Sequence, residues 1–343
     1  MNNIKKIGLS ALAGSLAMVS ANAVEYTMSG GMMTTYTTAD DLTANDNSGK
    51  GFGSATDLAF NASGELDNGF TVAYFMSVDT NSALTNTSSQ MTIGMGSLGT
   101  LQYNNIAGSK ANGIDDITPN AYNEVWDGLT TGLANNPSFF GSDTASGSLD
   151  YRIPAQEYMG TTINASVTYD PNQGAAAGAK GDVGADNVGS GTAYTLQVAH
   201  ESGLEVGGGY EGLGDKGSTA LSSETQRTTA YVKFAQGGLS VAYQESYQDT
   251  LNGTSVTGAD KESMTMGVAY TSGDWTISYG EGELTTKEVA TTAALATIEL
   301  DSIQAAYVMG AMTVSAAMSS TDNSDGIAGQ SYEENTLAVS FAF

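Results

Sequence analysis

Apolar and polar residues alternate with a period of two along most of the chain from Val24 onward. The segments 70–79, 159–170 and 261–271 each place apolar side chains on one face and polar or small side chains on the other. Gly, Asn, Asp and Ser separate these runs, and alternation bounded by such residues predicts β-strands between an apolar and an aqueous environment. Strands of a soluble β-sandwich also alternate, so no single run decides the fold.

The lengths of the connections decide more. Short and long connections alternate along the chain. Short ones include Asp67-Asn68-Gly69 and Ser202-Gly203, and long ones include 105–146 and 171–190. An up-and-down barrel produces this alternation because every second connection lies on the same side of the membrane, with tight turns on the periplasmic side and long loops outside. A sandwich with Greek-key connections has no reason to keep two length classes in register.

The sequence therefore predicts an all-β fold, a sixteen-stranded antiparallel up-and-down transmembrane β-barrel that forms one domain over residues 24–343. Sixteen is an even number, as in other single-chain bacterial barrels. The predicted strands are 24–38, 53–66, 70–79, 87–96, 99–104, 147–154, 159–170, 191–201, 204–211, 225–236, 239–249, 261–271, 274–281, 297–309, 311–320 and 331–343.

Residues 1–23 have the features of a Sec signal peptide. Lys5 and Lys6 precede an apolar segment, 7–19, and Ala21-Asn22-Ala23 fits an A-x-A cleavage site. The apolar segment is shorter than the roughly 20 residues that a spanning helix needs. We therefore expect export, and with the barrel pattern this predicts the outer membrane of a Gram-negative bacterium.

The mature chain is strongly acidic. Removal of the signal leaves nine of the 11 Lys and Arg residues against 37 Asp and Glu, a net charge of −28. Such a charge repels nucleic acid and attracts cations, although acidity can also serve solubility alone. The chain has no cysteine, so its stability cannot come from disulfides. A closed, hydrogen-bonded barrel supplies another source.

The last strand alternates up to an aromatic carboxyl terminus, Phe343. With the signal peptide, the first strand Val24-Glu25-Tyr26-Thr27-Met28-Ser29-Gly30, and Gly99-Thr100-Leu101 before the longest connection, the chain resembles Gram-negative general porins, the alphaproteobacterial type most closely. The resemblance implies a homotrimer in contact with outer-membrane lipid and lipopolysaccharide. It also implies passive diffusion of ions and small hydrophilic solutes, and no enzymatic activity.

In the family resembled, the third external loop folds into the barrel and carries carboxylates that face a basic patch on the wall. The matching segment is 105–146, far longer than the ~12–15 residues above which structureless loops are uncommon. We expect it to form the pore constriction with its acidic residues, and Trp126, Phe139 and Phe140 are available to pin it to the wall. The predicted constriction residues are Asp115, Asp116, Glu124 and Asp127.

The basic residues of the predicted pore wall are few. Leu149, Tyr151 and Ile153 take the outward parity of their strand, which turns Arg152 inward. The same parity on strand 225–236 turns Arg227 and Lys233 inward, and charges facing lipid near the midplane would cost about 2–4 kcal/mol. With an acidic loop and only three basic wall residues, we expect a preference for cations.

Other motifs carry less weight. Gly94-Met95-Gly96-Ser97-Leu98-Gly99 spells G-x-G-x-x-G, but it joins two predicted strands and so indicates a turn rather than a dinucleotide site. The segment 322–326 resembles part of a calcium loop without the ligand pattern of an EF-hand, which leaves Ca²⁺ among the acidic loops as the one cofactor considered. A membrane hydrolase would depend on His200, the single histidine. The main alternative to a channel is a surface adhesin or S-layer-like protein.

Overall fold

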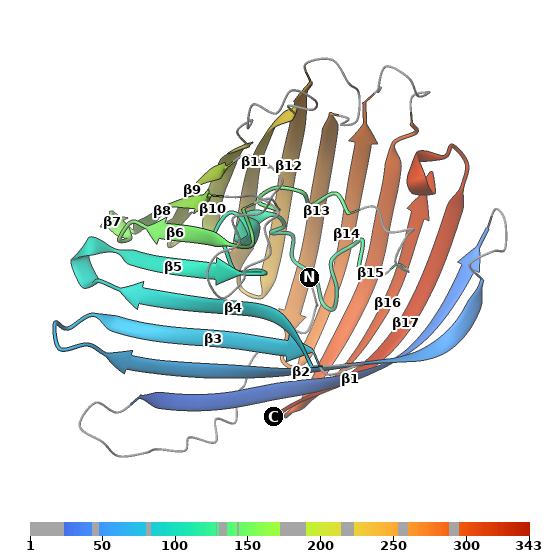
Figure 1. The fold of residues 1–343 in the computed structure, drawn as a ribbon. Coiled ribbons are helices and arrows are strands. Elements are labelled where there is room, and N and C mark those ends of the chain that lie inside the picture. Colours follow the sequence, from blue (N-terminus) through green and yellow to red (C-terminus); the bar gives the residue numbers. More distant parts are fainter. Residues whose placement is uncertain are drawn as a thin grey trace.

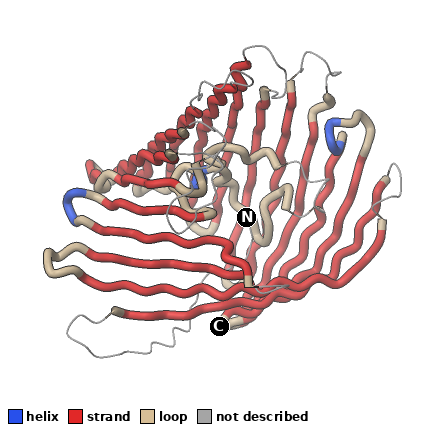
Figure 2. Tube along the Cα trace, in the orientation of Figure 1, coloured by secondary structure: helices blue, strands red, loops and turns tan. Residues whose placement is uncertain are grey.

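The computed structural model describes residues 24–42, 48–79, 84–127, 129, 136–142, 144–171, 190–213, 223–252, 260–287 and 295–343. The predicted signal peptide lies outside the described residues. The described part is built almost entirely of β-strands, and its only helical segments are short 3₁₀ turns (Figure 2). None of these helical segments is long and apolar enough to cross a membrane.

Seventeen strands belong to one antiparallel sheet of described residues (Figure 1). They are β1 (Glu25–Asp41), β2 (Gly49–Glu65), β3 (Thr71–Asp79), β4 (Thr85–Gly94), β5 (Thr100–Asn105), β6 (Ser148–Arg152), β7 (Gln156–Tyr158), β8 (Thr161–Asp170), β9 (Gly191–His200), β10 (Leu204–Leu213), β11 (Ser223–Gln236), β12 (Leu239–Asn252), β13 (Lys261–Ser272), β14 (Trp275–Thr286), β15 (Ile298–Met309), β16 (Met312–Asp322) and β17 (Ser331–Ala342).

The sheet closes on itself because β1 pairs with both β2 and β17. The last residue, Phe343, exchanges two backbone hydrogen bonds with Gly30 of β1 at 2.8 and 2.9 Å. Strands β6 and β7 both pair with β8, so they share one position around the ring. The described strands thus fill sixteen positions, and the predicted up-and-down barrel is confirmed.

Two details differ from the sequence prediction. Residues 155–158 were expected to connect two strands, but Gln156–Tyr158 pairs with β8, and the turn falls at Met159 and Gly160, which both have positive φ. Several strands also run further into the long connections, for example β1 and β2, which stay paired up to Ala39 and Gly49. Gly- and Asp-rich sequence suggested loops there, and cross-strand pairing overrides that local preference.

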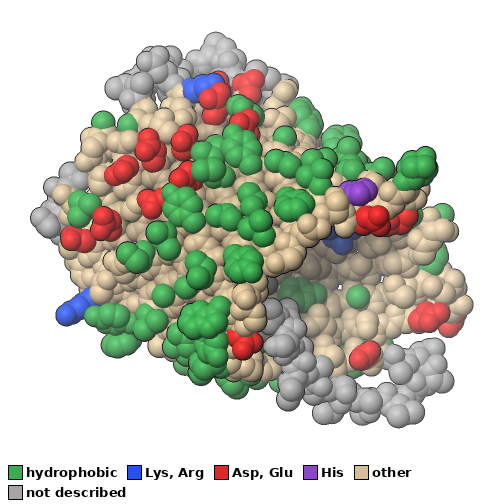
Figure 3. Space-filling view, turned by 180° about the vertical axis from the view of Figure 1, so that it is seen from behind, with side chains coloured by type: hydrophobic (Ala, Val, Ile, Leu, Met, Phe, Trp, Pro, Cys, Tyr) green, Lys and Arg blue, Asp and Glu red, His purple; other side chains and the backbone are tan. Residues whose placement is uncertain are grey.

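The outward faces of the strands are apolar. Hydrophobic side chains cover a broad area of the outer wall (Figure 3). On β17, Leu337, Val339 and Phe341 are exposed while Ala338 and Ser340 between them are buried, so the alternation places the small residues inside. Seven tyrosines near strand ends are exposed, in keeping with an aromatic girdle: Tyr26, Tyr103, Tyr151, Tyr158, Tyr210, Tyr243 and Tyr270.

Candidate functional site

The described residues of the connection between β5 and β6 lie inside the ring of strands, where Figure 1 draws them in green. Two inward-facing glutamines hold its backbone. Gln244 of β12 accepts a hydrogen bond from the Ile117 N–H at 3.1 Å and donates to the Ile114 carbonyl at 2.8 Å. Gln304 of β15 accepts from the N–H groups of Tyr122 and Asn123 at 2.8 and 3.1 Å and donates to the Asn123 carbonyl at 2.7 Å. These amides replace the strand partner that the loop backbone lacks.

Apolar contacts hold the same loop at two further places. One cluster joins Trp126 and Phe139 of the loop to wall residues of β14, β15 and β17: Leu284, Ile298, Leu300 and Tyr332. A second cluster joins Ile114 and Phe140 to Ala193 of β9 and Tyr231 of β11. Phe140 is completely buried. The three aromatic residues suggested by the sequence therefore pack against the wall.

Glycines on the inward face of the wall make room for these contacts. A Cβ atom on Gly209 would lie 2.4 Å from Cζ of Phe140, and one on Gly267 would lie 3.0 Å from the Pro119 carbonyl oxygen. A side chain at Gly209 would collide with the loop, and one at Gly267 would fit only if the loop shifted slightly. The barrel wall is thus shaped to hold the loop in one place.

A buried carboxylate fixes the limb of the loop that returns to the wall. Glu211 of β10 has no exposed surface and accepts hydrogen bonds from the N–H groups of Gly141 and Thr144 at 3.1 and 3.0 Å, and from the Thr144 hydroxyl at 2.8 Å. Arg227 of β11 pairs with it at 3.1 Å and also donates to Gln248 at 2.8 Å. The ion pair therefore belongs to the attachment of the loop.

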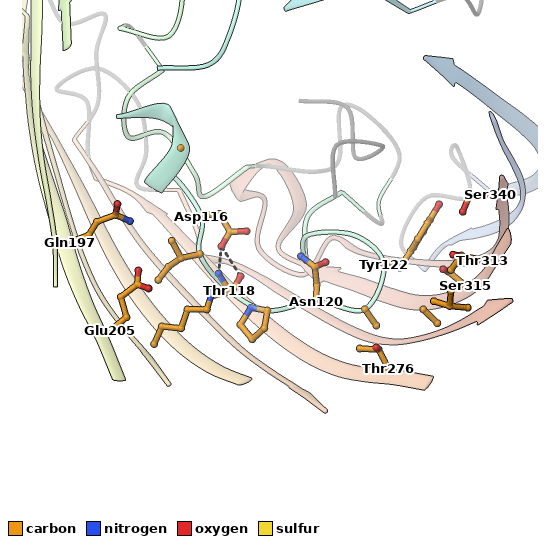
Figure 4. Close-up of a pocket in the computed structure, with 17 residues that line it drawn as sticks. Asp116, Thr118, Asn120, Tyr122, Gln197, Glu205, Thr276, Thr313, Ser315 and Ser340 are labelled. Carbon is orange, nitrogen blue, oxygen red and sulfur yellow. Dashed lines mark hydrogen bonds between the residues drawn. The ribbon is translucent and has the colours of Figure 1, made fainter. Parts of the chain in front are cut away.

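Below the loop, the lumen contains a cavity of about 600 Å³. Figure 4 shows Gln197 and Glu205 projecting into it from one side, the loop residues Asp116 to Tyr122 above, and hydroxyl side chains of the opposite wall. Those hydroxyls belong to Thr276, Thr313, Ser315 and Ser340. Hydroxyl and amide groups dominate the lining, which suits water and hydrated solutes.

The four predicted loop carboxylates occupy different surroundings. Asp116 lines the cavity and accepts hydrogen bonds from the N–H and hydroxyl of Thr118 at 2.8 and 2.6 Å (Figure 4). Asp115 accepts from the Asp116 N–H at 2.9 Å, so it shapes the turn. Glu124 and Asp127 are partly buried in the next bend, where the Asp127 N–H donates to the Glu124 carbonyl at 3.0 Å. Their roles in a constriction stay predictions.

The three predicted wall bases face the lumen but lie apart. Lys233 lines the large cavity together with Glu205 and Asp116. Arg152 pairs with the fully buried Asp150 of its own strand at 3.3 Å and lines a separate, smaller cavity. Arg227 lies at the return limb of the loop in its pair with Glu211. The structure does not join them into one basic patch.

Sequence reasoning missed Lys110 and Glu211. Lys110 lies on the loop, where no periodicity predicts orientation, and it lines the smaller cavity with Arg152. Burial is the main cause that lowers the pKa of Lys110, the charge of Arg152 adds to it, and Asp150 opposes it. Glu211 could have been found, since it has the same parity as Glu205 on an alternating strand.

The remaining motifs have structural surroundings. Residues 96–98 form the 3₁₀ turn between β4 and β5, as predicted for the G-x-G-x-x-G segment. The His200 Nδ1 accepts a hydrogen bond from the Ser202 N–H of its own turn at 3.1 Å. Within the described residues there is no group of three or more side chains suited to hold a metal ion, so calcium stays an untested prediction.

A family model described as Gram-negative porin matches residues 8–298. The chain belongs to the Gram-negative porin family. The predicted resemblance is confirmed, and the protein is a porin of the outer membrane. Membership of a channel family supports the prediction that it is not an enzyme and leaves the adhesin alternative without support. The alphaproteobacterial type stays a prediction.

Solved structures share the fold of this porin at low sequence identity. An anion-selective porin from Comamonas acidovorans is 14% identical, with a TM-score of 0.69 over 93% of this chain and 100% of that chain. OmpF of Salmonella typhi in complex with daunomycin is 14% identical, with a TM-score of 0.63 over 93% and 98%. The trimer form of OmpT, an outer membrane protein of Vibrio cholerae, is 10% identical, with a TM-score of 0.63 over 93% and 99%. A search of the curated proteins gave no significant match.

Proposed function

We propose that this porin is a water-filled channel for passive diffusion of ions and small hydrophilic solutes, with a preference for cations. The observation that carries the proposal is the polar cavity of about 600 Å³ between the inward-folded loop and the wall. Sixteen-stranded barrels enclose an aqueous channel rather than a packed core. The loop narrows this channel without filling it.

The charges on the cavity lining favour cations. Asp116 and Glu205 contribute two carboxylates, and Lys233 contributes one ammonium group. Arg152 and Arg227 are both engaged with fully buried carboxylates, so each local charge is largely balanced. Fixed charge of one sign in a narrow pore raises the local concentration of the opposite ion.

Reversal potentials of the purified porin in a KCl gradient test the preference. We expect potentials of the sign that indicates potassium permeation, and a shift toward zero in Asp116→Asn and Glu205→Gln. Glu299→Gln is the matched control, because Glu299 is exposed on the outward parity of β15. An anion preference of the unmodified porin would contradict the proposal.

We further propose a homotrimer whose outward apolar faces contact outer-membrane lipid and lipopolysaccharide. The trimer form of the OmpT neighbour, which shares the fold, supports this assembly. Chemical crosslinking in native membranes should give a ladder that ends at three subunits, and bilayer recordings should show openings in groups of three. A ladder that stops at one subunit would contradict it.

A further inference from the structure

A second, smaller cavity opens in the barrel wall where β6 ends. Its volume is about 160 Å³, and its lining includes Arg152 at the end of β6, the following Ile153, and Ala165 and Ser166 of β8. The β6–β8 pairing runs to Arg152 and Ser166, and pairing with β8 resumes at Gln156 in β7. The Ile153 N–H still donates to the Ala165 carbonyl of β8 at 3.1 Å, and because Pro154 has no N–H to donate, the ladder is interrupted between Ile153 and Gln156.

Two cations line this cavity without a carboxylate beside them in the lining. Lys110 lines this cavity with part of its surface exposed, and its ammonium group makes no hydrogen bond or ion pair with any described residue. Arg152 reaches Asp150 through Nη2 at 3.3 Å, and 26% of its side-chain surface stays exposed, with no further hydrogen bond from its guanidinium to a described residue. Both cations therefore retain donors for a ligand.

Asp150, the carboxylate beside Lys110 and Arg152, already accepts hydrogen bonds from the groups around it. Asp150 is completely buried and accepts hydrogen bonds from the Thr168 hydroxyl at 2.5 Å, the Lys110 N–H at 2.9 Å and Arg152. It holds the backbone of Lys110 and the guanidinium of Arg152 in place on one side of the hollow. Its oxygens are turned to these donors rather than to the cavity.

Neutral polar groups complete the lining. Asn164 and Gln197 offer amides, and the hydroxyls of Ser166 and Thr195 are hydrogen-bonded to each other at 2.6 Å. Gln197 also lines the large cavity, so the two cavities lie next to each other at this side chain. Lysine and arginine donors around a small polar space are the chemistry that binds carboxylate, sulfate or phosphate groups.

We propose that Lys110 and Arg152, with Gln197 and Asn164, form a binding subsite for a small oxyanion group inside the lumen of this acidic porin. The subsite would retain a carboxylate or phosphate group of a permeating solute while the rest of the pore favours cations. It goes beyond the proposed function, because its occupancy does not depend on the overall ion preference.

Sulfate is the probe, because it keeps its double negative charge over a wide pH range. In planar bilayers, replacing part of the KCl with K₂SO₄ at constant ionic strength should produce brief current interruptions in the unmodified porin. Lys110→Gln should raise the sulfate concentration needed for half block by roughly tenfold or more, as expected for the loss of one charge-assisted contact. Arg152→Lys, which keeps the charge but loses the planar guanidinium, should give a smaller loss.

Lys50→Gln is the matched control, since Lys50 is exposed on the outward parity of β2 and its removal should leave the sulfate block within about twofold of the unmodified porin. The thermal unfolding of the folded barrel in detergent provides a readout that does not require conduction. Sulfate should stabilise the unmodified porin more than Lys110→Gln. Equal sulfate effects in Lys110→Gln and the unmodified porin, or no sulfate effect in either assay, would overturn the subsite. The KCl reversal potential is decided separately, so failure of the cation preference is distinguishable from failure of the subsite.

Discussion

Replacement of the buried carboxylate of Glu211 by alanine should release the returning limb of the third loop. The change removes the acceptor for the Gly141 and Thr144 N–H groups and for the Thr144 hydroxyl, and it removes the partner of Arg227 at 3.1 Å. Breaking a buried ion pair by removing one partner costs about 3–5 kcal/mol. Arg227 keeps its hydrogen bond to Gln248, and lumen water can reach the freed N–H groups, so the lower end of this range applies.

A loss of about 3 kcal/mol changes the ratio of docked to undocked loop by roughly a hundredfold, at 1.4 kcal/mol for each factor of ten. Single-channel recording measures this change directly. We expect Glu211→Ala to show more frequent transitions between current levels and a larger maximal conductance than the unmodified porin. Glu211→Gln retains an acceptor for the loop N–H groups, so its frequency of current transitions should lie between those of the unmodified porin and Glu211→Ala.

The unfolding temperature of the barrel separates release of the loop from damage to the sheet. The strand register around Glu211 does not depend on its side chain, so the barrel should still form. Glu299→Ala serves as the control, because it removes an exposed carboxylate on the outward parity of β15. Its single-channel current should match that of the unmodified porin. If the current noise of Glu211→Ala equals that of the unmodified porin, the Glu211–Arg227 pair does not hold the loop.

Three further changes test other contacts of the lumen. Gln304→Leu removes three hydrogen bonds to the loop, two that the amide accepts and one that it donates. At about 0.5–1.5 kcal/mol for each net hydrogen bond, it should increase current noise in single-channel recordings to an extent comparable with Glu211→Ala. Gly209→Val places a side chain where the Cβ atom alone would lie 2.4 Å from the Phe140 ring. Overpacking of this kind costs about 1–3 kcal/mol, so the unfolding temperature should fall. The double variant Gly209→Val with Phe140→Leu should recover part of the loss. The sulfate concentration needed for half block should rise as the pH increases through the pKa of Lys110. Burial and the charge of Arg152 lower that pKa below 10.5, and Asp150 opposes the shift. Because the ammonium form predominates only below that pKa, the sulfate block should be strongest on the acid side of it, and a block that does not weaken as pH rises to 10.5 would contradict the assignment.

The fold could be predicted from the sequence because its causes are local. Alternation with period two sets the face of each side chain, and turn residues separate the strands, so the ring of sixteen positions follows without knowledge of distant contacts. The break at Pro154 was less visible, because a three-residue strand has too few positions to show a period. The start of one strand is predicted at residue 53, whereas the ladder of β2 already begins at Gly49, because the Gly-rich segment Gly49-Lys50-Gly51 gives no apolar alternation.

The site could be predicted only in part. Parity places Arg152, Arg227 and Lys233 on the lumen side, but it gives neither their depth nor their neighbours. Those depend on contacts across the barrel, such as Gln304 with the N–H of Tyr122, 182 residues away. Lys110 lies in an aperiodic loop, so its place beside Arg152 follows from the tertiary structure alone.

The same contacts explain why net charge is a poor guide to the field in the pore. Glu245 and Glu281 lie on the outward parity of their strands, where they accept hydrogen bonds from Tyr243 at 2.5 Å and from Tyr279 respectively. Asp150 and Glu211 face inward but are buried with their own arginines. Selectivity must therefore be decided by the few charges that solvent in the lumen can reach, which include Asp116, Glu205, Lys233 and Lys110. With so few charges, the exchange of a single one should move the reversal potential, whereas removing an outward carboxylate should not.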